Sequence, residues 1–265
     1  MRRYVKLYFT YVKRSIASRL EYKRDTFITI MSFLLSNVCS ILSIYFIMES
    51  IPSLDGWDVY MLGFLYGFTM MPVAIDHLLT DELWAIAYFR VKNGSVDGMF
   101  VRPVPVLFQV IAENFQPEGF GELIVGVVML ALCSFKVSVV WSFGTILMLV
   151  VATIFGAMVI TSFKIVFASM AFKFKRSGPL LQIVYNFIGY ARYPMSIYPA
   201  FLRAVLTFVF PFAVIISLPA EVFLGVINFS PYLVSLIVFG VAVVLLPLSV
   251  LIWTAFLKTY DSTGS

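Results

Sequence analysis

The chain has 265 residues, of which 61% are hydrophobic and 12% are charged, and its formal net charge is +5 at pH 7. Ordinary soluble domains contain about 45–50% apolar and about 25% charged residues, and a soluble domain of this length could not hide such an excess of apolar side chains. The composition therefore excludes a soluble enzyme. It predicts an all-α, polytopic membrane protein, because long apolar runs recur and helices of about 20 residues cross the hydrocarbon layer.

The first 25 residues are the most basic part of the chain and carry eight of the 19 lysines and arginines. Apolar side chains recur along them at helical spacing, at Val5, Phe9, Val12 and Ile16. This pattern predicts an amphipathic interfacial helix over residues 1–25, with its cations turned toward anionic membrane lipid. A secretory signal peptide is the alternative, but the apolar run that follows is too long for one.

Six apolar runs follow, and each predicts a membrane-spanning helix. They cover residues 27–48, 59–79, 121–135, 140–163, 178–193 and 233–257. The runs are continuous, whereas the strands of a transmembrane barrel alternate over about ten residues. Cys39 and Cys133 lie in these runs without ligand spacing, which predicts two buried thiols rather than a disulfide or a metal site. The domain prediction is a single transmembrane domain over residues 1–265.

Residues 194–225 are apolar but interrupted by prolines, and they decide the topology. Sixteen of the 19 cations gather on one side if that side holds the N-terminus, residues 80–119, a basic connector at 164–176 and the C-terminus. The positive-inside rule makes this side the cytoplasm. The arrangement requires that 194–225 does not cross the membrane, so this segment is predicted to be re-entrant from the outside. A seven-span arrangement, in which it crosses, is the alternative.

Residues 80–119 form the one long polar interval between spans. The central part, from Arg90 to Pro103, mixes glycines, charges and apolar side chains. A short helix held off the membrane in this way suits docking to a cytoplasmic partner, and a merely solvated loop is the alternative. The candidate docking residues are Arg90, Lys92, Gly94, Ser95, Asp97, Phe100, Arg102 and Pro103.

Motifs of catalysis are missing from the sequence: it has no nucleotide-binding P-loop, no G-x-S-x-G, no H-E-x-x-H and no Cys/His ligand cluster. The chain is therefore predicted not to be an enzyme, and energy for transport must come from a partner or from an ion gradient. Asp76 and His77 are predicted to form an interfacial cluster at the cytoplasmic end of the second span. Arg192 and Arg203 are predicted to lie at the outer interface. With so few ionisable residues inside the spans, an ion-coupled carrier is disfavoured.

Two weaker patterns mark the second span. Gly63 and Gly67 form a G-x-x-x-G pair, which permits close contact with another helix. Methionine and aromatic side chains of the second and fifth spans are candidates for a greasy cavity, with packing or lipid contact as the alternative. The candidate cavity residues are Met61, Phe64, Phe68, Met71, Tyr185 and Phe187.

Three stretches, taken in order, resemble the permease subunits of bacterial ABC-2 exporters, over essentially the whole chain. The first is Gly94-Ser95-Val96-Asp97-Gly98-Met99-Phe100-Val101-Arg102-Pro103, a Gly-x-x-Asp-x-x-x-x-Arg-Pro pattern. The second is an outer Tyr-Pro motif at Tyr193, Pro194, Tyr198 and Pro199, followed by Arg203, Pro211 and Pro219. The third is the C-terminal Tyr260-Asp261-Ser262-Thr263-Gly264, a Tyr-x-x-x-Gly tail.

The resemblance implies a fold of six transmembrane helices with an N-terminal interfacial helix, a coupling helix within 80–119 and a re-entrant outer segment at 194–225. It implies a separate ATPase subunit that binds ATP and Mg²⁺, a second permease in the complex, a place in the cell (inner or plasma) membrane with both termini cytoplasmic, and no cofactor on this chain. The expected function is export of an unidentified amphipathic compound, such as a drug, peptide or lipid-like molecule, by alternating access, and no nucleic-acid partner is expected. A gradient-driven carrier or channel, or a non-transport anchor for a cytoplasmic partner, is the alternative.

Overall fold

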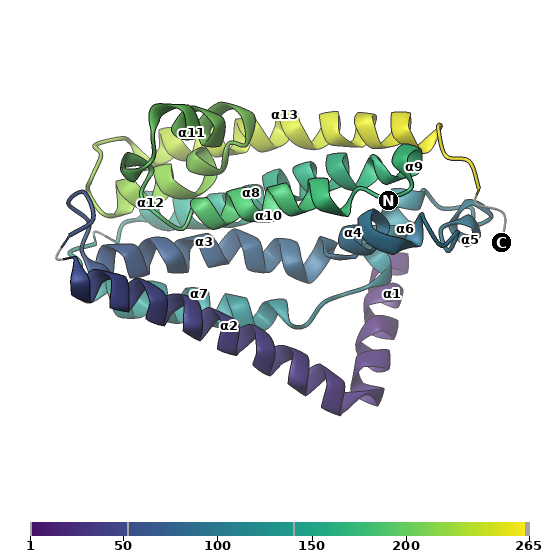
Figure 1. The fold of residues 1–265 in the computed structure, drawn as a ribbon, viewed down its shortest axis with the longest axis horizontal. Helices are drawn as coiled ribbons and strands as arrows, with labels where there is room; N and C mark the ends of the chain where they lie inside the picture. The colour runs from purple at the N-terminus through teal and green to yellow at the C-terminus, as the bar shows by residue number, and fades with distance from the viewer. Residues whose placement is uncertain (1, 52, 140, 263–265) are drawn as a thin grey trace.

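A computed structural model describes residues 2–51, 53–139 and 141–262. Long helices lie side by side along one axis, and α1 runs across that axis at one end (Figure 1). The α-helices are α1 (Arg2–Glu21), α2 (Lys23–Ser50), α3 (Val59–Thr80), α4 (Glu82–Ala85), α5 (Asp97–Phe100), α6 (Val106–Glu113), α7 (Gly119–Ser134), α8 (Phe143–Ser169), α9 (Ala171–Phe174), α10 (Gly178–Tyr190), α11 (Ala200–Ala204), α12 (Leu218–Phe223) and α13 (Pro231–Leu257). Turns of π-helix lie at Ile86–Arg90, Val205–Val209 and Ala213–Ser217, and a 3-10 turn at Met195–Ile197. The described residues form no β-strand, which confirms the all-α prediction.

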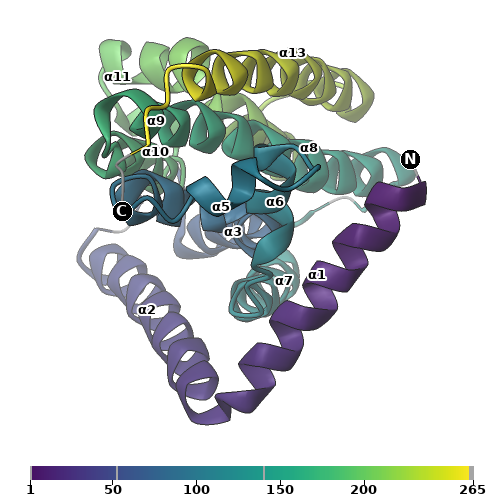
Figure 2. The same ribbon diagram turned by 90° about the vertical axis from the view of Figure 1, so that its right-hand side faces the viewer.

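The two ends of the helix bundle differ in what they carry. One end holds α1, the short helices α4 to α6, and the residues that follow α13 (Figure 1). We call it the basic end, because most lysines and arginines lie there. The predicted interfacial helix is confirmed as a helix, and α1 meets α2 at a sharp corner that stands away from the rest of the bundle (Figure 2).

The predicted number of spans is tested by helix length and composition. Among the described residues, four helices are long and apolar enough to cross a membrane, namely α2, α3, α8 and α13, and a bent pair of helices at 200–223 raises the number to at most five. The helices α7 and α10 lie in the bundle but have 16 and 13 residues, or about 24 and 20 Å at 1.5 Å per residue. They are shorter than the roughly 30 Å of hydrocarbon, so the six-span prediction is not confirmed.

Helix α8 shows how a predicted boundary moved. The predicted start at Val140 lies outside the described residues, and α8 begins at Phe143 because the Ser142 side chain caps it and accepts a hydrogen bond from the backbone N–H of Thr145. At the other end the prediction stopped at Phe163 because the next residue, Lys164, is charged. The helix continues through Lys164 to Ser169.

Helix α3 is the central element, since most of its side chains are buried between α7 and α8. Helix α2, in contrast, buries only Asn37, Ile44 and Met48, and the Tyr66 hydroxyl of α3 donates a 2.7 Å hydrogen bond to the Asn37 side chain. The light packing of α2 corrects one cysteine prediction: Cys133 is buried, but Cys39 on α2 is exposed.

The contact between α3 and α7 confirms the packing role of the G-x-x-x-G pair. A Cβ added at Gly63 would lie 2.6 Å from the Cys133 sulfur, and one at Gly67 would lie 2.9 Å from the backbone nitrogen of Leu130 and 3.0 Å from the carbonyl oxygen of Gly126. Backbone cannot give way as a flexible side chain can, so the approach of the two helices at Gly67 requires glycine.

We expect Gly67→Ala to lower the free energy of unfolding by about 1–3 kcal/mol, because the added methyl group forces α3 and α7 apart. Thermal unfolding of the detergent-solubilised chain measures it. Gly240→Ala is the matched control, since a Cβ at Gly240 in α13 meets nothing within 4 Å. Equal unfolding temperatures of the two variants would contradict the close approach.

The segment predicted to be re-entrant is sharply bent. The pieces Ala200–Val209 and Ala213–Phe223 meet at 82°, and Pro211, which has no backbone N–H to donate, lies at the break. The segment is therefore not a straight span, and both a re-entrant loop and a broken span have such a bend. At its start, the Tyr198 hydroxyl donates a 2.9 Å hydrogen bond to the carbonyl oxygen of Tyr190.

Candidate functional site

The polar interval, residues 80–119, folds at the basic end as a compact projection rather than an open loop (Figure 2). Its helices are short because Gly94 has a positive φ of 70° and because Pro103 and Pro105 interrupt the chain before α6. Val96 and Met99 of this interval are buried. The interval is thus packed onto the main hydrophobic core of the bundle, to which both residues belong.

Arg90 joins the two halves of this interval. Its guanidinium contacts Glu82 and Glu113, each at 2.6 Å. Burial raises the pKa of the Glu82 carboxyl, and the nearby Arg90 opposes that rise. Arg90 therefore fixes α4 to the end of α6, which is a structural role within the interval.

Gln109 on α6 holds the exposed part of the interval in place. Its side-chain nitrogen donates hydrogen bonds to the carbonyl oxygens of Met99 and Val104, at 2.9 and 2.8 Å, and its oxygen accepts one from Arg102 at 3.3 Å. The residue is fully buried. Sequence reasoning missed it, although a lone glutamine in the apolar run 106–112 was a usable signal.

Residues 92–103 form the exposed tip of the interval. Val101 is 85% exposed and Phe100 is 43% exposed, and both stand on the base held by Gln109. Lys92, Ser95, Arg102 and Pro103 are also exposed, whereas Gly94 is buried and Asp97 is half-buried. An exposed apolar group on a well-ordered base is typical of a surface that meets a partner.

The C-terminal tail, residues 258–262, closes over this tip. The Tyr260 hydroxyl donates to one carboxylate oxygen of Asp97 and the Ser262 hydroxyl donates to the other, both at 2.7 Å. The rings of Phe100 and Tyr260 stack with their centroids 5.3 Å apart. Two motifs that are 163 residues apart in the sequence therefore meet, although Thr263 and Gly264 of the tail motif lie outside the described residues.

Lys175 completes the tail contact. Its ammonium donates a 2.6 Å hydrogen bond to the carbonyl oxygen of Asp261 and lies 5.5 Å from the centre of the Tyr260 ring. The hydrogen bonds from Ser262 and Tyr260 lower the pKa of Asp97, while burial, followed by the Asp97 carboxylate, raises the pKa of Tyr260 to about 12. Asp97 thus stays charged and Tyr260 stays neutral across the whole neutral range.

Helix α1 is attached to the same interval. The Ser15 hydroxyl donates to the side-chain oxygen of Asn114 at 3.3 Å and accepts from the backbone N–H of Phe115 at 3.1 Å. The Arg19 guanidinium contacts Glu118 and Gln116. α1 is therefore fixed to the segment that leads from α6 into α7.

Charged side chains also lie inside the bundle. Lys164 on α8 is fully buried, and its ammonium contacts Asp76 on α3 and Asp81 just after α3, both at 2.9 Å. Thr80 and Thr161 each donate a 2.6 Å hydrogen bond to Asp76. These contacts correct two predictions: Lys164 does not lie in a basic connector, and Asp76 is not an interfacial residue that reaches water.

His77 extends this network to α7. Its Nδ1 lies 3.0 Å from a carboxylate oxygen of Glu122, and its Nε2 lies 3.4 Å from Asp81. An imidazolium donates from both ring nitrogens, so the arrangement suits the charged ring. We call Asp76, His77, Asp81, Glu122 and Lys164 the buried charge cluster.

A cavity of about 490 Å³ lies beside the cluster. Asp76, His77, Asp81 and Glu122 line it together with Tyr185 and Arg192. Arg192 lies over the Tyr66 ring at 5.4 Å, and Tyr66 lies seven residues into α3, about 10 Å from its start. Arg192 thus lines a cavity of the bundle, whereas Arg203 is exposed. The outer interfacial position of both residues stays a prediction.

Comparison with protein families decides what kind of protein carries this arrangement. A family model described as ABC-2 family transporter protein matches residues 34–264, which include the interval, the bent segment and the tail. The chain belongs to the ABC-2 transporter family. No curated protein and no solved structure matches it.

This ABC-2 protein is a multi-pass membrane protein, a permease component of an ABC transporter system that includes an ATPase partner. The family component is not itself catalytic, which agrees with the prediction made from missing motifs. The recognition of the ABC-2 family from the three motifs is confirmed.

The structure distributes the candidate cavity residues over several places in the ABC-2 protein. Phe64 and Phe68 are buried and packed against Phe223, and Met61 is half-buried on the same helix. Of the remaining three, Tyr185 lines the cavity at the charge cluster, Met71 lines a different cavity of about 420 Å³, and Phe187 stacks on Phe210. The proposed greasy cavity is therefore not one site, and the cavity that contains Tyr185 is charged.

Proposed function

We propose that this ABC-2 protein is the permease subunit of an ATP-driven exporter and that residues 92–103 dock on its ATPase subunit. The observation that supports docking is the exposed apolar tip, Phe100 and Val101, on a base held by Gln109 and by the tail. The exposed Lys92 and Arg102 flank this tip and suit an acidic rim around the ATPase groove. ATP and Mg²⁺ bind to the ATPase, and the permease carries no cofactor.

Movement of the tip reaches the transmembrane helices along two routes. Within the interval, the Arg90 ion pairs connect the end of α6 to α4, which follows α3 directly. The segment after Glu113 leads into α7. α3 carries Asp76 and α7 carries Glu122, so a shift between these helices changes the charged cavity. ATP binding then favours one access state by stabilising the conformation in which two ATPase subunits close.

The basic end faces the cytoplasm in this proposal, because lysines and arginines are retained on that side of a membrane. Both termini are then cytoplasmic, and the protein lies in the cell (inner or plasma) membrane with α1 along the inner lipid surface. A second permease, identical or related, completes the transport path. The exported compound is amphipathic, because the cavity combines apolar walls with charged groups.

Val101→Asp tests the docking role. The full chain is coexpressed with a candidate P-loop ATPase and purified, and the copurified ATPase is quantified. Loss of one central apolar contact should reduce the recovered ATPase by about tenfold or more. Phe174→Asp is the matched control, since Phe174 is 56% exposed at the same end but outside the tip. Equal recovery from both variants, or no ATPase recovered with the wild-type chain, contradicts the proposal.

The buried charge cluster supports a second candidate, a gradient-driven carrier. The expectation against ion coupling rested on spans with few ionisable residues. Asp76, His77, Glu122 and Lys164 weaken that premise, because they meet in one buried cluster. Membership of the ABC-2 family favours ATP as the energy source. Vesicles containing the complex separate the two, because an ionophore abolishes gradient-driven transport and leaves ATP-driven transport intact.

A further inference from the structure

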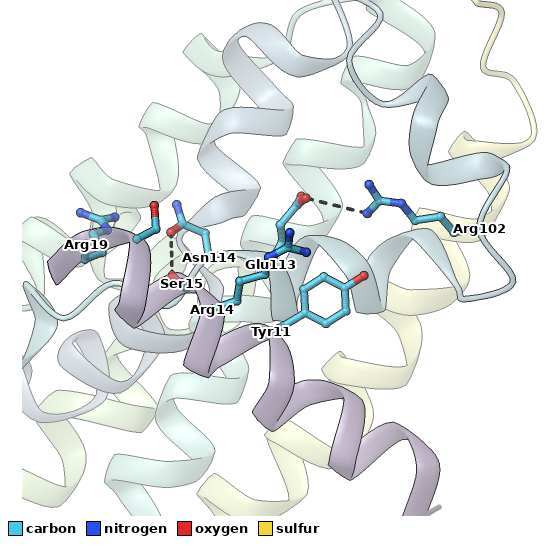
Figure 3. Close-up of a pocket in the computed structure, with 8 residues that line it drawn as sticks. Tyr11, Arg14, Ser15, Arg19, Arg102, Glu113 and Asn114 are labelled. Atoms are coloured by element: carbon cyan, nitrogen blue, oxygen red, sulfur yellow. Dashed lines mark hydrogen bonds and ion pairs between the residues drawn. The ribbon is translucent and has the colours of Figure 1, made fainter. Parts of the chain in front are cut away.

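A pocket of about 590 Å³ lies between α1 and the polar interval, and it shares no lining residue with the cavity at the buried charge cluster. Its α1 side consists of Tyr11, Arg14, Ser15, Ser18 and Arg19, which recur at helical spacing and so share one face of the helix. Arg102, Glu113 and Asn114 of the interval form the opposite wall (Figure 3). The pocket is thus built by two elements that the chain brings together over nearly 100 residues.

The charges of this pocket are not balanced. Arg19 is paired with Glu118, and the half-exposed Arg102 lies 3.9 Å from Glu113. Arg14 makes no ion pair or hydrogen bond with any described residue. The guanidinium groups of Arg14, Arg19 and Arg102 therefore share a pocket whose lining has one carboxylate, that of Glu113. The Arg14 guanidinium has no counter-ion among the described residues. Arginine binds phosphate oxygens through paired hydrogen bonds, so the pocket has the chemistry of a phosphate site.

The position of α1 indicates where that phosphate comes from. The helix runs across the long helices (Figure 1) and exposes an apolar line that includes Val5, Phe9 and Ile16. An amphipathic helix of this kind rests with its apolar line in the lipid surface. Successive residues of an α-helix are about 100° apart around its axis. The face of α1 that lines the pocket therefore lies roughly a third of a turn around the helix from its apolar line. The pocket is then at the depth of the lipid headgroups.

We propose that this pocket binds the phosphate of an anionic phospholipid headgroup from the same leaflet. Arg14 supplies the unpaired charge, and Arg19 and Arg102 hold the headgroup between α1 and the polar interval. A volume of about 590 Å³ lies within the usual range of ligand pockets. A bound headgroup bridges α1 and the base of the exposed tip, so the anionic lipid content of the membrane sets how firmly the two are joined.

Amide exchange on the full chain in phosphatidylcholine nanodiscs tests this site. Dihexanoyl phosphatidylglycerol is titrated in, and exchange of residues 113–118 is followed. We expect protection that saturates with phosphatidylglycerol, and an apparent Kd about tenfold higher in Arg14→Gln. Lys13→Gln, the exposed neighbouring cation outside the pocket, should change the Kd less than twofold.

Ser18→Leu is a second variant, because its apolar side chain occupies part of the pocket while all three arginines remain. It should weaken phosphatidylglycerol binding as Arg14→Gln does, and gel filtration with circular dichroism establishes that each variant is folded. Equal effects of Arg14→Gln and Lys13→Gln would overturn the proposal in favour of diffuse surface charge. Full binding by Ser18→Leu, or equal protection by dihexanoyl phosphatidylcholine, would also overturn it. The same protection from inorganic phosphate would assign the site to a soluble anion instead of a lipid.

Discussion

Lys164→Met is expected to lower the free energy of unfolding of this ABC-2 permease by about 3–5 kcal/mol. Lys164 is fully buried on α8 and lies between Asp76 and Asp81, 2.9 Å from a carboxylate oxygen of each. Methionine retains the apolar stem but removes the ammonium. The buried Asp76 carboxylate then loses its cationic partner and lies close to the Asp81 carboxylate. Denaturant unfolding in detergent micelles measures the loss.

Two variants identify the cause of that loss. Lys173→Met, at an exposed lysine only nine residues further along, should have almost no effect, since exposed charges contribute little. Asp76→Asn combined with Lys164→Met should recover most of the stability, because it removes the buried carboxylate together with its partner. In this double variant Asp81, which is more exposed than Asp76, still has the neighbouring His77 as a partner. If Lys164→Met proves no more destabilising than Lys173→Met, the buried ion pair is contradicted.

The cluster also shows where sequence reasoning stopped. A charge next to a long apolar run usually marks the end of a span, so Lys164 was assigned to a connector and the end of α8 was predicted six residues too early. Its partner Asp76 lies 88 residues earlier. No local pattern pairs two residues at that distance, and the buried charge cluster became visible only when α3 and α8 were placed together.

Local signals served better for single helices. The periodic apolar residues of α1 and the unbroken run of α13 are properties of short windows, and both helices were predicted within a few residues. The Gly63 and Gly67 spacing correctly predicted close contact, although only the structure identifies α7 as the partner helix. Cys39 was misjudged because burial of α2 depends on its neighbours, not on its own apolar run.

The candidate docking site was recognised by its motifs, but its construction was not. Asp97 and Tyr260 belong to two separate motifs 163 residues apart, and neither motif states that it binds the other. Arg90, predicted to face a partner, instead joins Glu82 to Glu113 inside the interval. The exposed Lys92, Phe100 and Arg102 occupy positions open to a partner, and their docking role stays a prediction.

Asp97→Ala is expected to release the tail from the exposed tip. The substitution removes the carboxylate that accepts hydrogen bonds from the Tyr260 and Ser262 hydroxyls. The contacts of the Tyr260 ring with Phe100 and Phe172 and the Lys175 contact remain. Amide exchange of residues 258–262 should accelerate by on the order of tenfold, the effect of losing charge-assisted hydrogen bonds. Asp261→Asn is the matched control, because Asp261 contributes its backbone carbonyl, not its carboxylate, to the contact.

The same variant connects the tail to the proposed function. If the tail stiffens the tip for docking, Asp97→Ala should also reduce transport per ATP hydrolysed by the copurified complex by on the order of tenfold, while Asp261→Asn does not. The transport per ATP hydrolysed by Tyr260→Phe should lie between the values of these two variants, since Tyr260→Phe loses one hydrogen bond but keeps the stacked ring. Rapid exchange of the tail with unchanged coupling would show that the clamp serves stability alone, whereas lost coupling with a protected tail would place the role of Asp97 in direct contact with the ATPase.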